Sequence, residues 1–136
     1  MPQRLCLIET LTVRENVLLP LALAGKSDVE GRRRADELLR TLDIEMLAAR
    51  RPVAISVGQA ARTSLARALV AQPRLLLADE PTAALDATSA NLVAHAIATY
   101  AESGGAAVVA SHDPQLREML GQCLPQGSVH TLELPR

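Results

Sequence analysis

The N-terminal half of the chain has apolar residues at helical spacing, separated by turn signals. The T-x-x-E capping box at Thr12 predicts a helix from about residue 13 to residue 24, ended by Gly25. An S-x-x-E box at Ser27 predicts the start of a second helix, whose buried positions are Ala35, Leu38, Leu39 and Leu42. A third helix is expected from about Ser56 to Val70. The first half is therefore predicted to be all-helical.

The second half has the pattern of a parallel α/β sheet. Leu75 to Ala78 is a short apolar run without alternation, typical of a strand buried on both faces. A helix from about Ala87 to Tyr100 and a second strand from Ala106 to Ala110 follow, and this order implies a right-handed parallel crossover. A short helix is predicted after Pro114, and a last strand from Ser128 to Leu134.

Composition excludes several classes of protein. Hydrophobic residues make up 49% of the 136 residues, which excludes low-complexity disorder. The longest apolar run, Val17 to Ala24, is too short for a membrane span, which needs about 20 residues. No secretory signal is visible, so a cytoplasmic location is expected. The net charge of −1 favours no nucleic-acid partner. A disulfide between Cys6 and Cys123 is neither supported nor excluded.

Two adjacent carboxylates, Asp79 and Glu80, end the first predicted strand. Neighbouring strand residues point to opposite faces, so the two side chains need not have the same role. In nucleotide hydrolases with a parallel sheet, the first carboxylate at such a strand end holds magnesium. A second carboxylate can orient or deprotonate the attacking water. The alternative is a strand that ends in solvated acids.

The motifs around these carboxylates resemble those of the ATP-binding subunits of ABC transporters. Residues 55–59, Ile-Ser-Val-Gly-Gln, resemble the signature motif, and residues 75–80 resemble Walker B with its catalytic glutamate. Residues 84–86, Ala-Leu-Asp, resemble the D-loop, His112 the switch histidine, and Gln3 the Q-loop glutamine. Residues 15–21 are similar to the branch that includes macrolide exporters and lipoprotein-release ATPases.

The resemblance implies an incomplete P-loop NTPase-type parallel sheet, a three-layer αβα fold, with an inserted helical subdomain. Residues 1–11 would form the Q-loop segment, and residues 12–70 the helical subdomain with the signature motif. Residues 71–136 would form the second half of the nucleotide-binding core, with Walker B, the D-loop and the H-loop.

The resemblance also implies ATP and Mg²⁺ as cofactors. Asp79 and Gln3 would hold magnesium, Glu80 would activate the attacking water, and His112 with Gln3 would sense the γ-phosphate. The signature and D-loop residues would bind ATP across a dimer: Ser56, Gly58, Gln59 and Asp86. Ser56 can cap the helix that follows it, and a helix N-terminus is an anion site.

The partners implied by the resemblance are a transmembrane permease and a second nucleotide-binding subunit. The helices between Gln3 and Val53 would face the permease. The chain would then be a cytoplasmic subunit, peripheral to the inner face of the membrane, of a transporter that is expected to be an exporter.

The phosphate-binding loop of this family, which should precede Gln3, does not occur in the 136 residues. Gly25-Lys26-Ser27 looks like the end of G-x-x-x-x-G-K-S, but Pro20 stands at the first glycine position, and a helix precedes the triplet. We therefore expect the chain alone to be inactive as an ATPase without a Walker A motif. Val57 replaces the first glycine of the signature, and its branched side chain disfavours positive φ.

Two alternatives stay open. The chain could be a non-catalytic half-domain that acts as an interaction partner, or a decayed ABC ATPase. A basic regulatory surface at Arg32–Arg34 is a further possibility, but the acids interleaved there favour a solvated helix face.

Overall fold

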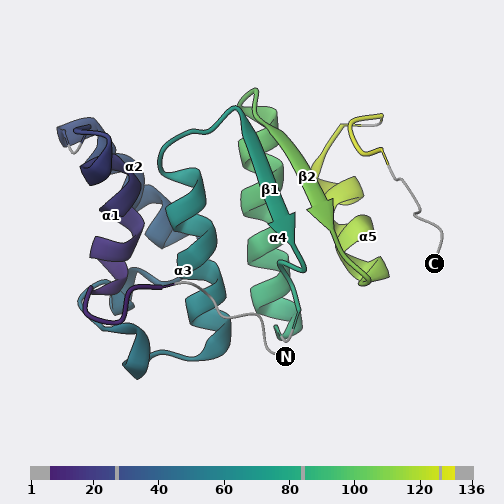
Figure 1. The fold of residues 1–136 in the computed structure, drawn as a ribbon. Coiled ribbons are helices and arrows are strands. Elements are labelled where there is room, and N and C mark those ends of the chain that lie inside the picture. The colour runs from purple at the N-terminus through teal and green to yellow at the C-terminus, as the bar shows by residue number, and fades with distance from the viewer. Residues whose placement is uncertain (1–6, 27, 84, 126, 131–136) are drawn as a thin grey trace.

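The computed structural model describes residues 7–26, 28–83, 85–125 and 127–130. Helices α1, α2 and α3 form one side of the molecule, and a two-stranded sheet with α4 and α5 forms the other (Figure 1). Gln3 and Cys6, two residues singled out from the sequence, lie outside the described residues. Cys123 is a free, exposed cysteine.

The first helix, α1 (Val13–Leu23), has the predicted capping box. The Thr12 side chain accepts from the Glu15 N–H, and the Glu15 carboxylate accepts from the Thr12 N–H. Asn16 is fully buried and closes the turn before the helix, because its side-chain amide exchanges hydrogen bonds with both backbone groups of Ile8. The helix ends before Gly25, whose φ is 67°.

The predicted start of the second helix is wrong by one residue. Helix α2 (Val29–Thr41) is capped by Asp28, whose carboxylate accepts from the Gly31 N–H at 2.7 Å. Two cap-forming residues, Ser27 and Asp28, stand side by side in the sequence, so the spacing alone favoured the wrong one. Ser27 itself lies outside the described residues.

Two short 3₁₀ helices, η1 (Glu45–Leu47) and η2 (Pro52–Ala54), connect α2 to α3 (Val57–Leu69). Helix α3 has Ser56 as its N-cap, as the sequence predicts, and a capping box with Gln59.

Strand β1 (Leu75–Asp79) and strand β2 (Ala106–Ala110) are parallel neighbours, with Leu75 opposite Ala106 and Asp79 opposite Ala110. Helix α4 (Ala87–Glu102) forms the crossover between them, and α5 (Pro114–Cys123) follows β2. These elements confirm the predicted α/β fold with a parallel sheet. The expected last strand is not seen over Ser128 to His130, and its remaining residues lie outside the described part of the chain.

The expectation that β1 is buried on both faces is wrong for the described residues. Leu76 is 4% exposed, whereas Leu77 is 72% exposed and its neighbour Val108 is 59% exposed. Helices α4 and α5 both lie behind the sheet in Figure 1. Only one face of the sheet is therefore covered by the elements that the structure describes, which leaves an apolar row in contact with solvent.

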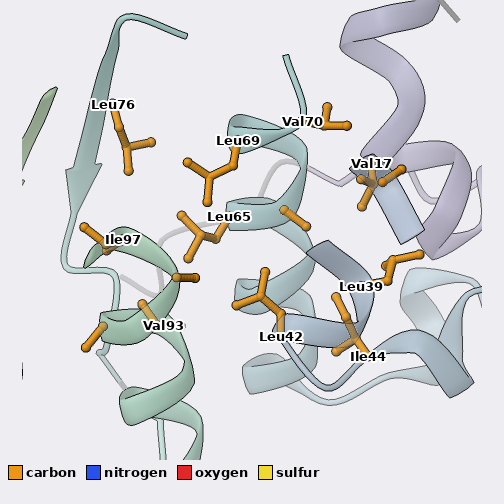
Figure 2. Packing of buried hydrophobic residues seen from close by; sticks show 14 of the residues in the cluster. Val17, Leu39, Leu42, Ile44, Leu65, Leu69, Val70, Leu76, Val93 and Ile97 are labelled. Carbon is orange, nitrogen blue, oxygen red and sulfur yellow. The ribbon is translucent and has the colours of Figure 1, made fainter. Parts of the chain in front are cut away.

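The core is continuous from α1 to α5, and α3 is at its centre. Figure 2 shows Leu65 and Leu69 on the side of α3 that meets Leu76 of β1 and Ile97 of α4. The opposite side of α3 packs on the cluster of α1, α2 and the turn that follows α2, which includes Val17, Leu39, Leu42 and Ile44 (Figure 2). The proposed boundary at residue 70 divides one hydrophobic core, and it remains a prediction. In the described ranges, no helix combines the length and the hydropathy that a bilayer crossing requires.

Candidate nucleotide-binding site

The candidate site lies where the two parallel strands end. The carboxyl ends of β1 and β2 lie at the same edge, because the strands are parallel and Asp79 is opposite Ala110. The N-terminal ends of α3 and α4 lie at this end of the molecule too (Figure 1). The topology therefore brings together the predicted carboxylates, the predicted histidine and two helix N-termini.

Glu80 leaves the strand in an unusual backbone conformation. Its φ is 48°, in the left-handed region that non-glycine residues rarely adopt. The Glu80 N–H still donates to the Ala110 carbonyl at 2.8 Å, so the strand pairing extends one residue past β1. Such a conformation costs about 1–3 kcal/mol and is kept only where surrounding contacts hold it.

Two donors from the loop after β2 hold both carboxylate oxygens of Glu80. The Ser111 hydroxyl donates to Oε2 at 3.0 Å, and the His112 backbone N–H donates to Oε1 at 2.8 Å. The His112 Nε2 lies 4.0 Å from Oε1, and the imidazole is fully exposed. The structure thus brings Glu80 and His112 side by side, and their roles remain a prediction.

Three further residues complete this network, Ser111, Asp113 and Thr82, and none of them was among the predicted site residues. The Asp113 N–H donates to the Ser111 hydroxyl oxygen at 3.1 Å, and one Asp113 oxygen caps α5 through the Gln115 N–H. The other Asp113 oxygen accepts from the buried Thr82 hydroxyl at 3.3 Å. Their positions in the sequence were the available signal: Ser111 and Asp113 flank His112, and Thr82 follows Glu80 by two residues.

Asp79 faces away from this network. It lies on the uncovered face of the sheet and lines a shallow hollow with Leu77, Ala78, Val108 and Ala110. The two adjacent carboxylates therefore lie in different surroundings, as strand alternation predicts.

The chemistry of Asp79 fits a magnesium ion only in part. No group of three or more potential ligands of the His, Cys, Asp or Glu type occurs in the described part of the chain. Magnesium keeps several waters and is bound through one or two carboxylates plus substrate phosphates, so one carboxylate suits it when a nucleotide is present. Gln3, the second expected ligand, is not among the described residues.

The signature residues form the N-terminus of α3. The Ser56 Oγ accepts from the Gln59 N–H at 3.2 Å, and the Gln59 Oε1 accepts from the Ser56 N–H at 2.9 Å. Val57 is the first helical residue, with 66% of its surface exposed, and it is not among the described residues with positive φ. The expected difficulty with valine therefore does not arise here, because the position has ordinary helical backbone.

The signature helix packs closely on the start of α4. A Cβ at Gly58 would lie 3.3 Å from the Leu85 Cδ2 and 4.0 Å from the Ser89 Oγ. Asp86 caps α4 and accepts from the Ser89 N–H at 2.8 Å and from the Ser89 hydroxyl at 3.1 Å. These hydrogen bonds, the backbone one first, lower the pKa of Asp86. Gly58 therefore allows the signature and the D-loop segment to approach within one chain.

Arg62, one turn further along α3, links this helix to α2. Its Nη1 donates to the carbonyls of Leu42 and Asp43 at 2.7 and 3.2 Å, at the C-terminal end of α2 where helix carbonyls lack partners. The side chain is buried, so a cation neutralises this helix end from inside the fold.

Gly25 and Lys26, the described residues of the Gly25-Lys26-Ser27 triplet, stand apart from this site. The Lys26 N–H donates to the Leu21 carbonyl at 2.8 Å, at the C-terminal end of α1. A phosphate loop would have to follow a strand, whereas this triplet follows helix α1, so the structure agrees with its exclusion.

The chain belongs to the ABC transporter family. The sequence pattern of that family, described as ABC transporter, matches residues 1–83. Over 131 residues the chain is 39% identical to the lipoprotein-releasing system ATP-binding protein LolD 2 of Caulobacter vibrioides, a match that covers 96% of this chain and 57% of that protein. Over 108 residues it is 44% identical to the uncharacterized ABC transporter ATP-binding protein YvcR of Bacillus subtilis, which covers 79% of this chain and 42% of that protein. The chain thus spans about half the length of these curated relatives.

Solved structures agree with the sequence relatives. The dimeric structure of MJ0796, described as a bacterial ABC transporter cassette, matches with a TM-score of 0.76 and 35% identity over 86% of this chain and 53% of that chain. A second structure of MJ0796, with the same TM-score of 0.76, is described as a post-hydrolysis state bound to ADP and Pi. The predicted family and fold class are therefore confirmed.

Proposed function

We propose that this chain supplies the signature, Walker B, D-loop and H-loop parts of an ATP-hydrolysing subunit that drives an ABC transporter. The observation that carries the proposal is the cluster at the strand ends. There Glu80 is held by Ser111 and His112, and Asp79 lies on the other side of the strand.

Each carboxylate has a role that suits its surroundings. Glu80 would accept a proton from the attacking water, since its carboxylate is held in place and three-quarters buried beside an exposed imidazole. His112 would donate to a phosphate oxygen. Asp79 would hold Mg²⁺ together with Gln3, and the ion supplies charge neutralisation to the phosphates when it is bound.

The N-terminus of α3 would bind the γ-phosphate that a second subunit holds. A helix N-terminus attracts anions through its N–H groups and its dipole, and α3 is 13 residues long. Ser56, Gly58, Gln59 and Asp86 are the residues proposed for this surface. The dimeric form described for MJ0796 supports it.

The wider setting is proposed from the relatives. A permease partner, docked on the helices between Gln3 and Val53, follows from the names of the ABC transporter relatives, and a cytoplasmic position at the inner membrane face follows from that partner. The name of the LolD 2 relative, a lipoprotein-releasing system ATP-binding protein, supports export as the direction of transport.

Hydrolysis requires a Walker A segment, which the 136 residues do not contain. P-loop enzymes take much of their triphosphate affinity from the backbone cradle and lysine of that segment. The second candidate is a non-catalytic half-domain, which would offer the capped N-terminus of α3 to another chain. Both candidates use the same residues and differ only in turnover.

The test joins a family Walker A segment in frame to the N-terminus and measures magnesium-dependent ATP hydrolysis. We expect turnover by the fused cassette, and a loss of about a hundredfold or more in Glu80→Gln with ATP binding retained, because the amide keeps the shape but takes no proton. Glu118→Gln, at an exposed position on α5, is the matched control. Equal turnover of Glu80→Gln and its parent would remove Glu80 from the role of base, and an inactive fusion that binds ATP would favour the non-catalytic half-domain.

A further inference from the structure

The hydroxyl of Ser111 lies at the centre of a directed chain of hydrogen bonds. Its oxygen accepts from the Asp113 N–H at 3.1 Å, so its own hydrogen is left to donate to the Glu80 Oε2 at 3.0 Å. Asp113 is fixed in turn, since it caps α5 and accepts from the buried Thr82 hydroxyl. The contact joins residues 31 positions apart, one from each strand end.

The Glu80 carboxylate needs such a support. The backbone of Glu80 is in a left-handed conformation, and its side chain has several rotatable bonds with which to leave the strand end. The His112 N–H holds only Oε1. Without a second donor on Oε2 the carboxylate can rotate about that single hydrogen bond. Even a small misplacement of a catalytic group lowers the rate of reaction strongly.

We propose that Ser111 is a positioning residue for Glu80, which orients the carboxylate for its reaction with water. The proposal rests on the proposed function of Glu80 as base. Ser111 touches neither nucleotide nor water in this role; it acts by fixing the second carboxylate oxygen while the backbone of His112 fixes the first.

Threonine is the conservative substitution at this position. It keeps the hydroxyl, and its extra methyl group has room because Ser111 is exposed. Alanine removes the hydroxyl alone. Ser103 offers a matched control, since it is an exposed serine whose hydroxyl donates to the Tyr100 carbonyl at 2.7 Å, at the far end of α4.

The first experiment measures steady-state ATP hydrolysis by the cassette fused to a Walker A segment. We expect Ser111→Ala to lower kcat by about tenfold to a hundredfold with an unchanged KM for ATP. Ser111→Thr should restore kcat to within about threefold of the parent, and Ser103→Ala should match the parent. Full activity of Ser111→Ala, a loss that threonine does not restore, or a change confined to KM would overturn the proposal.

The second experiment separates this proposal from the proposed function. Amide hydrogen exchange at His112 is measured in the 136-residue chain itself, which needs no turnover. Release of the Glu80 carboxylate should speed exchange of the His112 N–H in Ser111→Ala, but not in Ser111→Thr or Ser103→Ala, with exchange in the α3 helix unchanged. An inactive fused parent would contradict hydrolysis, whereas unchanged exchange at His112 would contradict the positioning role of Ser111.

Discussion

The ring of Tyr100 lies directly against the backbone of Gly105. A Cβ built at Gly105 would overlap the ring, at a separation that real Cβ atoms essentially never show. The Tyr100 hydroxyl donates to the Pro73 carbonyl at 2.9 Å and is 3.2 Å from the Ala106 carbonyl. The one aromatic residue of the chain therefore ties the entries of β1 and β2 to the end of α4.

This contact predicts that Gly105→Ala is destabilising. The added methyl group would displace Tyr100 and loosen its hydrogen bonds, so the free energy of unfolding should fall by about 1–3 kcal/mol in urea titrations. Gly121→Ala is the matched control, because no atom lies within 4 Å of a Cβ there and the residue is inside α5. The free energy of unfolding of Gly121→Ala should rise by about 0.5–1 kcal/mol. An equal loss of stability in both variants would contradict the proposed role of the Tyr100–Gly105 contact.

The uncovered face of the sheet predicts self-association of the 136-residue chain. Leu77 and Val108 are exposed side by side in the register of the strands, and an open apolar sheet face attracts further protein. In sedimentation velocity we expect oligomers in the parent and a shift toward monomer in Leu77→Glu. Met46→Glu is the control, since Met46 is 91% exposed but lies on η1. A parent that is monomeric at all concentrations would contradict this prediction.

Asp86 predicts a specific dependence of stability on pH. The Ser89 hydrogen bonds lower the pKa of Asp86 in the folded chain. The ionised carboxylate therefore contributes to the free energy of unfolding at pH values above the pKa of the unfolded carboxyl. That contribution is lost as the pH falls through the folded pKa. The Asp86→Asn variant keeps a capping oxygen but does not titrate. Its free energy of unfolding should therefore fall less than that of the parent between about pH 5 and about pH 2.5.

The control for this pH dependence is Glu102→Gln, which removes an exposed carboxylate at the end of α4. Glu15 and Glu30 also have lowered pKa values, from the Thr12 and Arg33 hydrogen bonds respectively, and their effect is common to all variants. If the free energy of unfolding of the parent and of Asp86→Asn changed with pH in parallel, Asp86 would not be the source of this pH dependence.

Nucleotide binding should depend on a Walker A segment. We expect no ATP binding by the 136-residue chain at micromolar nucleotide in calorimetry, since the backbone cradle and lysine that hold the phosphates in P-loop enzymes do not occur in these residues. The fused cassette should bind ATP with magnesium, and Asp79→Asn should weaken that binding by about tenfold or more. Asp36→Asn, which breaks a surface pair with Arg14 on the helical side, is the control. Saturable ATP binding by the unfused chain that is abolished in Asp79→Asn would contradict this prediction, because the phosphate site would then lie within the 136 residues.

Features that depend on neighbours three or four positions apart could be predicted from the sequence. The capping boxes of Thr12 with Glu15 and of Ser56 with Gln59 are local hydrogen bonds, so the starts of α1 and α3 were predictable. The order of strands and helices likewise predicted a parallel pair, and the motif spacing predicted the family. Where two local signals competed, at Ser27 and Asp28, the sequence could not decide the start of α2.

Features that depend on contacts between distant residues could not be predicted in this way. The exposure of Leu77 follows from which elements cover the sheet, and no local pattern contains that information. The left-handed turn at Glu80 and its hydrogen bond to Ser111 require the parallel register of two strands joined by a whole helix. A sequence pattern reports the local preference of each segment, whereas the partner that meets a side chain from another segment is set by the packing of the complete core, because only packing brings the two strand ends together.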